Sequence, residues 1–286
     1  MRRNKIKQVM ESDQLALGAY VGLADPQIVE IIGIAGFDAA FIDMEHTSFD
    51  LSIVQQMIIA AELVGIAPIV RVSDSDPGFI LRVLDMGAQG IVIPHVDGLE
   101  GAKEAVNAVR YAPIGTRGGA GGTRAASFGD VSWADHVRTS NEEILLSVMT
   151  EDAKAIEQVP EIAALDGVDL VALGPTDLSQ TLGVTDPSDP KLKNEVERIA
   201  NEVKQAGNAK LQIPMNHPAF PLGPDDLVRL GVGYTHVAPP PPAILMREMK
   251  KSLTSIHEAL GLSLIHISEP TRPRLSSYAV FCLKKK

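Results

Sequence analysis

The sequence predicts a single parallel (β/α)8 TIM barrel, with a doubly wound open sheet as the alternative. Short apolar runs alternate eight times with longer amphipathic segments. The length of 286 residues fits one large α/β domain of about 250 residues better than two ordinary ones. Glu151 and Asp177 each follow an apolar run, and their spacing of 26 residues matches one strand-plus-helix repeat.

Each repeat is expected to contain one strand and one helix. The strands are expected at residues 15–21, 39–43, 67–72, 90–94, 144–150, 168–173, 210–214 and 233–237. The helices are expected at residues 27–35, 52–63, 77–86, 99–110, 153–164, 191–206, 224–230 and 244–260. Start signals such as Asp25-Pro26 and Asp76-Pro77, and stop signals such as Gly65 and Gly207, support these boundaries.

One connection, residues 111–143, is too long for a simple turn. It carries Arg117 and Arg124 among five glycines between Gly115 and Gly122. It matches neither common phosphate-binding motif. We therefore expect a flexible loop that covers an anionic substrate, with the two arginines as candidate substrate contacts.

Charge and composition exclude several classes of partner. The net charge is -10, and residues 263–286 contribute +4, so residues 1–262 carry -14, which argues against nucleic acid as the main partner. The most apolar stretch, residues 51–70, is interrupted by polar side chains, so no membrane span is expected. Glu11 and Asp13 stand where a signal peptide needs apolar residues, and Cys282 is the only cysteine, so a reducing cytoplasm is the expected location.

The domain expected to fold is residues 1–262. From Ser263 the sequence abandons the preceding pattern and resembles translated vector read-through. Residues 263–286 are therefore expected to lie outside the barrel.

Polar residues at the strand ends suggest a site, because parallel barrels carry their chemistry at the carboxyl ends of their strands. The second strand delivers Asp43, Glu45 and His46, and the third delivers Arg71. Glu151 and Asp177 supply hard oxygen ligands that suit a divalent cation such as Mg²⁺ or Mn²⁺. The alternative is that each carboxylate only stabilises a helix N-terminus.

The remaining candidates are assigned by the chemistry of their side chains. His46 could act as a base, because imidazole titrates near neutral pH, although a loop histidine is more often a surface residue. Arg71 could stabilise an enolate oxygen or form an ordinary ion pair. Backbone amides after Gly174, near Thr176, could bind a carboxylate. His95, His217 and His236 also fall near strand ends and are interpreted as structural polar groups.

At these positions the sequence resembles the HpcH/HpaI family of class II, metal-dependent pyruvate aldolases. The resemblance is carried by FIDMEHTSFD (41–50), IVRV (69–72), LLSVMTEDA (145–153) and GVDLVALGPTDLS (167–179). It extends from about residue 15 to about residue 253 and keeps the order and spacing of these motifs. The family implies a (β/α)8 barrel that assembles as a homo-oligomer, either a dimer with exchanged C-terminal helices or a hexameric trimer of such dimers.

The resemblance also implies roles for individual residues. Glu151 and Asp177 would hold the metal ion, which could be Mg²⁺, Mn²⁺ or Co²⁺. His46 would be the acid/base supported by Asp43, and Arg71 would contact the ketone oxygen. The carboxylate of the 2-oxo acid would meet Gly174 and Thr176, and Asp85 matches a family carboxylate near the site. Met149 stands where many members have Gln, and PMNHPAF (214–220) also departs from better-known members, so the substrate is affected more than the chemistry.

The functional hypothesis is an aldolase that forms or cleaves 4-hydroxy-2-oxo acids from an aldehyde and the metal-held enolate of pyruvate or hydroxypyruvate. Arg117 or Arg124 could pair with a distal carboxylate of the aldehyde. No lysine occupies a strand end that the chemistry needs, which argues against a Schiff-base mechanism. The alternatives are an acyl-CoA lyase of the malyl or citryl type on the same barrel, and a non-catalytic barrel that binds a small acid.

Overall fold

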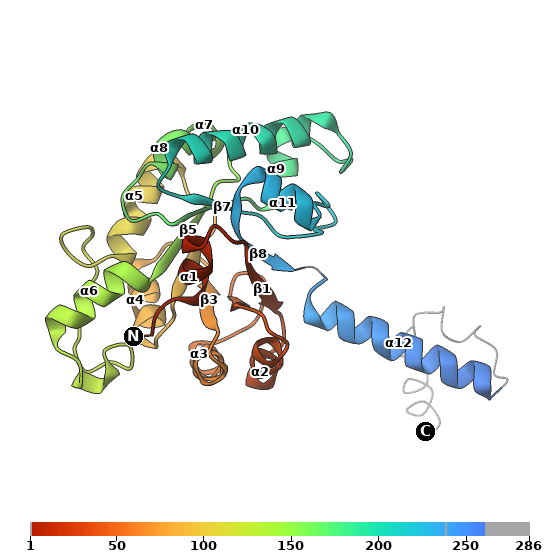
Figure 1. Ribbon diagram of the computed structural model, residues 1–286, viewed down its shortest axis with the longest axis horizontal. Coiled ribbons are helices and arrows are strands. Elements are labelled where there is room, and N and C mark those ends of the chain that lie inside the picture. Colours follow the sequence, from red (N-terminus) through yellow and green to blue (C-terminus); the bar gives the residue numbers. More distant parts are fainter. Residues whose placement is uncertain (1, 238, 261–286) are drawn as a thin grey trace, which may run out of the picture. The chain divides into compact units, whose positions relative to one another are not determined.

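Eight parallel strands close into a barrel in the computed structural model, which describes residues 2–237 and 239–260 (Figure 1). The strands follow one another in sequence order, and β1 pairs with β8 in a register that places Gly18 beside His236. All eight predicted strands are confirmed. Their bounds are β1 (Ala16–Val21), β2 (Ala39–Asp43), β3 (Ala67–Arg71), β4 (Gly90–Ile93), β5 (Leu145–Met149), β6 (Leu170–Ala172), β7 (Lys210–Gln212) and β8 (Val232–Val237).

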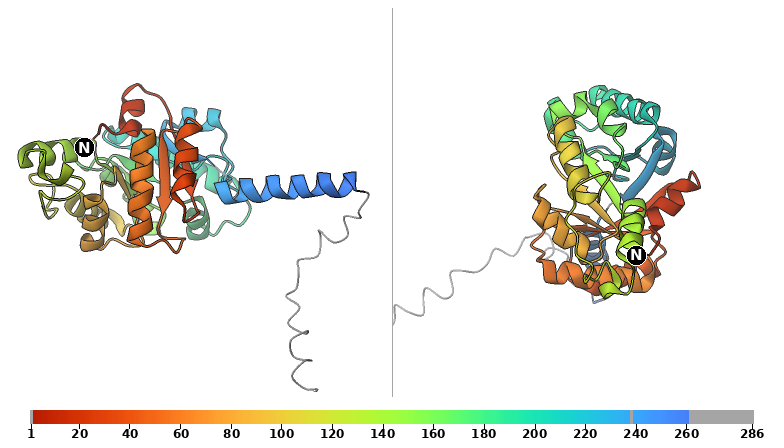
Figure 2. Two further views of the ribbon diagram at one scale, coloured as in Figure 1. Left: turned by 90° about the horizontal axis from the view of Figure 1, so that it is seen from below. Right: turned by 90° about the vertical axis from the view of Figure 1, so that its left-hand side faces the viewer.

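Helices surround the outside of the barrel (Figure 2). Those that match predicted helices within the barrel are α2 (Pro26–Ile34), α3 (Leu51–Val64), α4 (Pro77–Asp85), α5 (Gly98–Val109), α10 (Pro190–Ala206) and α11 (Pro224–Leu230). The helix predicted at 153–164 is divided into α7 (Ala153–Glu157) and α8 (Val159–Ala163). Pro160 causes the division because it has no backbone N–H to continue the helical hydrogen bonds.

Three helical segments were not predicted. They are α1 (Lys5–Glu11), α6 (Trp133–Glu143) and α9 (Pro175–Leu182), and a short 3-10 turn spans Ser127–Gly129. α6 falls within the connection that was expected to be a loop. It begins at Ser132, whose side chain accepts a hydrogen bond from the backbone N–H of Asp135. This capping signal was hidden among glycines and polar residues.

The barrel interior is filled by side chains that alternate along the strands. Phe41, Ile69, Val92, Leu145 and Tyr234 belong to this inner cluster. Tyr234 fits because Gly18 opposite it has no side chain, and a Cβ at Gly18 would lie 2.3 Å from the Tyr234 hydroxyl oxygen. A larger apolar cluster lies between the strands and the surrounding helices. Because side chains fill the interior, a functional site must lie at one of the two ends of the barrel.

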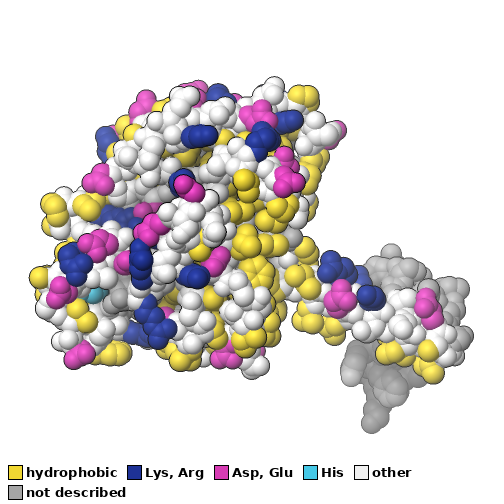
Figure 3. All heavy atoms as spheres, viewed as in Figure 1, with side chains coloured by type: hydrophobic (Ala, Val, Ile, Leu, Met, Phe, Trp, Pro, Cys, Tyr) yellow, Lys and Arg dark blue, Asp and Glu magenta, His cyan; other side chains and the backbone are white. Residues whose placement is uncertain are grey.

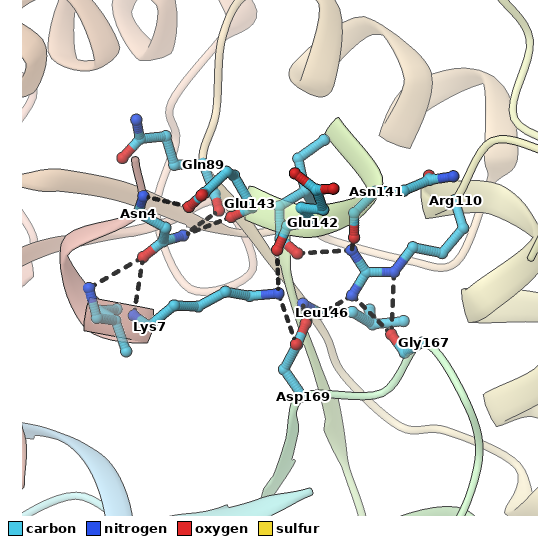
Figure 4. Close-up of polar contacts among 12 residues, drawn as sticks. Asn4, Lys7, Gln89, Arg110, Asn141, Glu142, Glu143, Leu146, Gly167 and Asp169 are labelled. Atoms are coloured by element: carbon cyan, nitrogen blue, oxygen red, sulfur yellow. Dashed lines mark hydrogen bonds and ion pairs between the residues drawn. The ribbon is translucent and has the colours of Figure 1, made fainter. Parts of the chain in front are cut away.

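The amino end of the barrel is closed by α1, whose Ile6 is fully buried in the inner cluster. Asn4 caps this helix by accepting a hydrogen bond from the backbone N–H of Ile6 at 3.0 Å. Its amide nitrogen donates to the backbone oxygens of Gln89 at 2.7 Å and Glu143 at 3.0 Å, as Figure 4 shows. One buried side chain therefore ties α1 to the starts of β4 and β5.

Arg110 forms a second part of this amino-end network (Figure 4). Its guanidinium is 2% exposed, and it donates to the backbone oxygens of Ile144 at 2.6 Å and Gly167 at 2.7 Å. It also pairs with Asp169 at 2.6 Å, and Lys7 reaches the same carboxylate at 2.7 Å. The arginine thus satisfies the backbone groups of turns that would otherwise be buried without partners.

Two arginines of the connection 111–143 contact the ends of α3 and α4, at the amino end of the barrel. Arg124 pairs with Glu62 in the last turn of α3 and donates to the backbone oxygen of Met86 after α4. Arg117 pairs with Asp85 at the end of α4, at 2.8 Å. Both arginines are held in ion pairs within this chain, and the expectation of a loop that covers the substrate stays a prediction. The connection leads from the end of α5 to the start of β5, and such helix-to-strand segments lie opposite the strands' carboxyl ends.

α12 (Pro241–Ala259) has no buried side chain. It belongs to a separate compact unit that begins at Pro242, whereas the barrel unit extends to Pro241. A single domain over residues 1–262 and exchange of the last helix stay predictions, and the tail predicted at 263–286 lies outside the described residues.

Acidic and basic side chains alternate over the face of the barrel in Figure 3, without a continuous basic patch. Within the described ranges, no helix has the length and apolar character needed to cross a membrane.

Replacing Asn4 with Ala is expected to lower the free energy of unfolding by about 3 kcal/mol, because a helix cap and two buried hydrogen bonds are lost together. Urea denaturation measures the change. Asn208→Ala is a matched control, because that amide donates a single exposed hydrogen bond to the oxygen of Ala164. Equal losses in the two variants would contradict the role of Asn4.

Candidate active site

At the carboxyl end of the barrel, Asp43 and Arg71 form a two-pronged ion pair between the ends of β2 and β3. Arg71 Nε and Nη2 each lie 2.8 Å from a different oxygen of the fully buried Asp43. Tyr20 donates its hydroxyl to Asp43 at 2.6 Å, and the backbone N–H of Glu45 donates at 3.1 Å. Burial alone would raise the pKa of Asp43, but the hydrogen bonds and charge of Arg71 outweigh it and hold that pKa below its usual range.

Glu45 and His95 extend this ion pair across the site toward β5. Arg71 Nη1 lies 2.9 Å from Glu45. His95 Nε2 lies 3.3 Å from Glu45, and its Nδ1 lies 3.5 Å from Glu151 Oε1. The backbone of His95 has a φ of +48°, a conformation that is costly for a residue with a side chain. The fold therefore holds this imidazole between two carboxylates.

Glu151 follows β5, and its side chain is only 1% exposed. Its Oε2 atom is buried without a hydrogen-bond partner. Burial, together with the nearby negative charge of Asp177, raises the pKa of Glu151 to about 7. A carboxylate in this position gains from a positive charge placed against its free oxygen.

Gly174 allows Glu151 to occupy this position. A Cβ at Gly174 would lie 2.1 Å from Glu151 Oε2. Asp177 stands in the first turn of α9, where Gln180 donates to it at 3.3 Å. The short connection from β6 through Gly174 into α9 therefore brings the second carboxylate toward the first.

The residues present fit a hard divalent cation. Among the described residues, no group of three or more His, Cys, Asp and Glu side chains could enclose a metal ion. Glu151 and Asp177 instead offer two carboxylates, one with an unpaired buried oxygen. Such a donor set suits an ion whose other positions are filled by water and substrate oxygens.

The other predicted contacts lie around this pair. His46 is 63% exposed in its side chain, and its Nε2 is 3.7 Å from Glu45. Asp43 was expected to support His46, but it is occupied by Arg71 and Tyr20, so Glu45 is the nearest carboxylate to His46. The Met149 sulfur lies 3.9 Å from Arg71 Nη1. The backbone amides of Thr176 and Asp177 are in the first turn of α9, where N–H groups have no partner within the helix.

Asp85, Arg117 and Arg124 do not join the site within this chain. They form their ion pairs at the amino end of the barrel, as described above. The family resemblance suggested Asp85, and the glycine-rich connection suggested the two arginines, because a loop sequence does not reveal which end of a barrel it occupies.

Comparison with known proteins identifies the family. The family model described as HpcH/HpaI aldolase/citrate lyase matches residues 16–217. The chain belongs to the HpcH/HpaI aldolase/citrate lyase family. Within it, the chain is an aldolase-type carbon–carbon lyase, in agreement with the prediction from the sequence.

Individual relatives of this HpcH/HpaI chain cover most of its length. It is 36% identical to a hydroxypyruvate/pyruvate aldolase of Roseovarius nubinhibens over 208 residues, which are 72% of this chain and 80% of the relative. It is 36% identical to a 5-keto-4-deoxy-D-glucarate aldolase of Shigella boydii over 205 residues, 71% of this chain and 79% of that protein. The crystal structure of an HpcH/HpaI aldolase from Desulfitobacterium hafniense has a TM-score of 0.79 and 28% identity, and it covers 88% of this chain and 96% of that one.

Two residues near the site were missed as participants. Tyr20 lies on β1, and its pKa is raised by burial and by its hydrogen bond to Asp43. His95 was interpreted as structural. Tyr20 occupies a strand position that points into the barrel, and His95 comes shortly after the end of β4. These positions were the only indication in the sequence that the two residues lie near the site.

The raised pKa of Glu151 predicts a stability effect that depends on pH. Because the folded pKa lies above the usual value of 4.5, ionising Glu151 destabilises the metal-free fold as pH rises from 4.5 through 7. Glu151→Gln should therefore raise the free energy of unfolding at pH 8 by about 3 kcal/mol and have little effect at pH 4.5. Urea denaturation at both pH values tests this, with the exposed Asp225→Asn as a matched control. Equal stability of Glu151→Gln and the parent at pH 8 would contradict the burial of an unpaired charge.

Proposed function

We propose that this protein is a class II aldolase that forms or cleaves 4-hydroxy-2-oxo acids from pyruvate or hydroxypyruvate and an aldehyde. The observation that carries the proposal is the buried, unpaired oxygen of Glu151 beside Asp177, next to the Arg71 network at the barrel mouth. The names of the two relatives support the donor class, because one is a hydroxypyruvate/pyruvate aldolase and the other cleaves a keto sugar acid.

Glu151 and Asp177 would hold a divalent cation, such as Mg²⁺, Mn²⁺ or Co²⁺. When bound, such an ion supplies a Lewis acid that makes the C3 protons of a 2-oxo acid easier to remove. Gly174 leaves room for the Glu151 carboxylate itself, since a Cβ at residue 174 would lie 2.1 Å from Glu151 Oε2. The amide N–H groups of Thr176 and Asp177 would receive the carboxylate of the 2-oxo acid at the start of α9.

Arg71 would stabilise the negative charge that develops on the ketone oxygen. Asp43 fixes the guanidinium through two hydrogen bonds, so little reorganisation is needed when the charge appears. His46 would transfer the proton, with Glu45 as its neighbouring carboxylate. The exposed His46 ring is free to approach a bound substrate, whereas the His95 ring is held between Glu45 and Glu151.

The two alternatives have less support. An acyl-CoA lyase needs basic groups for the phosphates of CoA, and Arg117 and Arg124, which were the candidates, pair with Asp85 and Glu62 at the amino end. A non-catalytic barrel that binds a small acid would need the carboxylates Glu151 and Asp177 to hold the cation, but it would not need His46 to transfer a proton. The exchange experiment below separates this alternative from the aldolase.

The assembly is proposed to be a homo-oligomer in the cytoplasm, a dimer with exchanged C-terminal helices or a trimer of such dimers. Support comes from α12, whose apolar side chains are exposed in a single chain. These are Ile244, Leu245, Met246, Met249, Leu253 and Ile256.

The aldolase proposal predicts deuterium exchange into the methyl group of pyruvate. On chelator-stripped protein in D₂O, exchange followed by proton NMR should require added Mg²⁺, Mn²⁺ or Co²⁺. His46→Ala and Asp177→Asn should each slow it by at least about a hundredfold, the usual contribution of general acid–base catalysis. Asp225→Asn, an exposed carboxylate on α11, is the matched control and should exchange at the parent rate.

Exchange without any metal, or full exchange in Asp177→Asn, would contradict the proposal. Tight binding of pyruvate without exchange, with every metal, would favour the non-catalytic barrel.

A further inference from the structure

His236 lies at the mouth of the barrel and has no role in the chemistry described above. It follows Tyr234 by two residues on β8, so both side chains point into the barrel interior. The His236 ring stacks on Phe41 with a centroid distance of 4.5 Å and an interplanar angle of 22°. The Arg71 guanidinium lies 5.6 Å from the centroid of the same phenyl ring. His236 therefore borders the space in front of Arg71.

One of the two ring nitrogens of His236 is accessible to a ligand. Nδ1 is buried and unpaired. The residue as a whole is only half-buried, and neither ring nitrogen has a hydrogen bond within the described part of the chain, so Nε2 is the nitrogen that remains accessible. A buried N–H without an acceptor is rarer than a buried acceptor without a donor. We therefore assign the proton to Nε2, where it can be donated into the barrel mouth.

The charge state of His236 restricts the groups that it can recognise. Burial, with the positive charge of Arg71 and the neighbouring His217, lowers the pKa of His236 to about 3. The facing Asp43 acts in the opposite direction but does not offset them. The ring is therefore neutral near pH 7 and offers a hydrogen bond without a charge.

The position of β8 selects which part of a substrate His236 can reach. The two carboxylates proposed to hold the cation, Glu151 and Asp177, follow β5 and β6. β8 is two strands beyond β6 in the barrel. Adjacent strands are about 4.8 Å apart, so β8 lies roughly 10 Å from β6. A donor on β8 thus reaches the distal substituent of an acceptor aldehyde and leaves its reacting carbonyl next to the 2-oxo acid.

We propose that His236 determines acceptor specificity by donating its Nε2–H to the hydroxyl oxygen of an uncharged hydroxyaldehyde. This inference rests on the proposed aldolase function and names its second substrate class. Arg71 at the end of β3 and Lys154 just after β5 are both paired in the described part of the chain, which favours an acceptor without a carboxylate. Arg71 is already paired with Asp43 and Glu45, and Lys154 pairs with Asp97 at 2.8 Å.

The test compares two aldehydes of equal size, glycolaldehyde and propionaldehyde, which differ by a hydroxyl in place of a methyl group. With pyruvate as donor, the parent should have the higher kcat/KM for glycolaldehyde. His236→Phe keeps a ring to stack on Phe41 but has no donor, and it should reduce this preference by about two- to tenfold, the contribution of one neutral hydrogen bond. His236→Gln places an amide N–H at a similar reach and should retain most of the preference.

An unchanged preference in His236→Phe would overturn the inference, as would a higher kcat/KM of the parent for succinic semialdehyde than for glycolaldehyde. If His236→Phe does not fold, His236→Leu serves the same comparison, because it also lacks a donor. Pyruvate methyl exchange in the parent separates the two levels of failure. Absent exchange removes the aldolase function and this inference with it, whereas normal exchange with an unchanged preference removes only the role of His236.

Discussion

The structure of the site depends on an electrostatic constraint, the enclosure of Glu151 with one oxygen unpaired and Asp177 nearby. The buried Glu151 carboxylate loses the solvation that water would give, and the partly exposed Asp177 carboxylate repels it. In this protein the arrangement persists because Gly174 provides the space and β5 and α9 fix the two side chains. A site that is unfavourable without a cation is well suited to bind one.

The groups around this pair distribute charge across the barrel mouth. Arg71 is held by Asp43 and Glu45, and His95 lies between Glu45 and Glu151. Carboxylates therefore alternate with the nitrogen-bearing side chains of Arg71 and His95 from β2 to β5. In the proposed function, Arg71 would meet the ketone oxygen of the 2-oxo acid, and Glu151 and Asp177 would hold the cation. The opposite end of the barrel, closed by α1 and Arg110, provides the rigid base that such positioning requires.

The sequence was sufficient to predict all eight strands, because buried parallel strands are continuous apolar runs between glycines and helix caps. It also placed Glu151, Asp177, Arg71 and Asp43 at one end of the barrel. The connection 111–143 was harder to predict, because its arginines pair with Asp85 and Glu62 through tertiary contacts. α9 was not among the predicted helices, although free backbone amides were expected after Gly174 and Pro175 is favourable at the first position of a helix.

The partners of individual polar residues were less predictable than their locations. The family resemblance implied that Asp43 supports His46, but in the structure Arg71 binds Asp43 from the next strand through two hydrogen bonds. His95 and His236 were interpreted as structural because a lone histidine gives no indication of its neighbours. Their positions depend on a positive φ at His95 and on the stack between His236 and Phe41, which are properties of the folded barrel.

We propose that Glu151 and Asp177 bind one cation together. Calorimetric titration of Mn²⁺ into the metal-free protein, Glu151→Gln, Asp177→Asn and the double variant tests it most directly, because the four affinities form a double-mutant cycle. If the two carboxylates share an ion, each single variant should lose most of the affinity and the double variant should lose little more. Unchanged affinity in either single variant, or losses that simply add, would contradict a shared site.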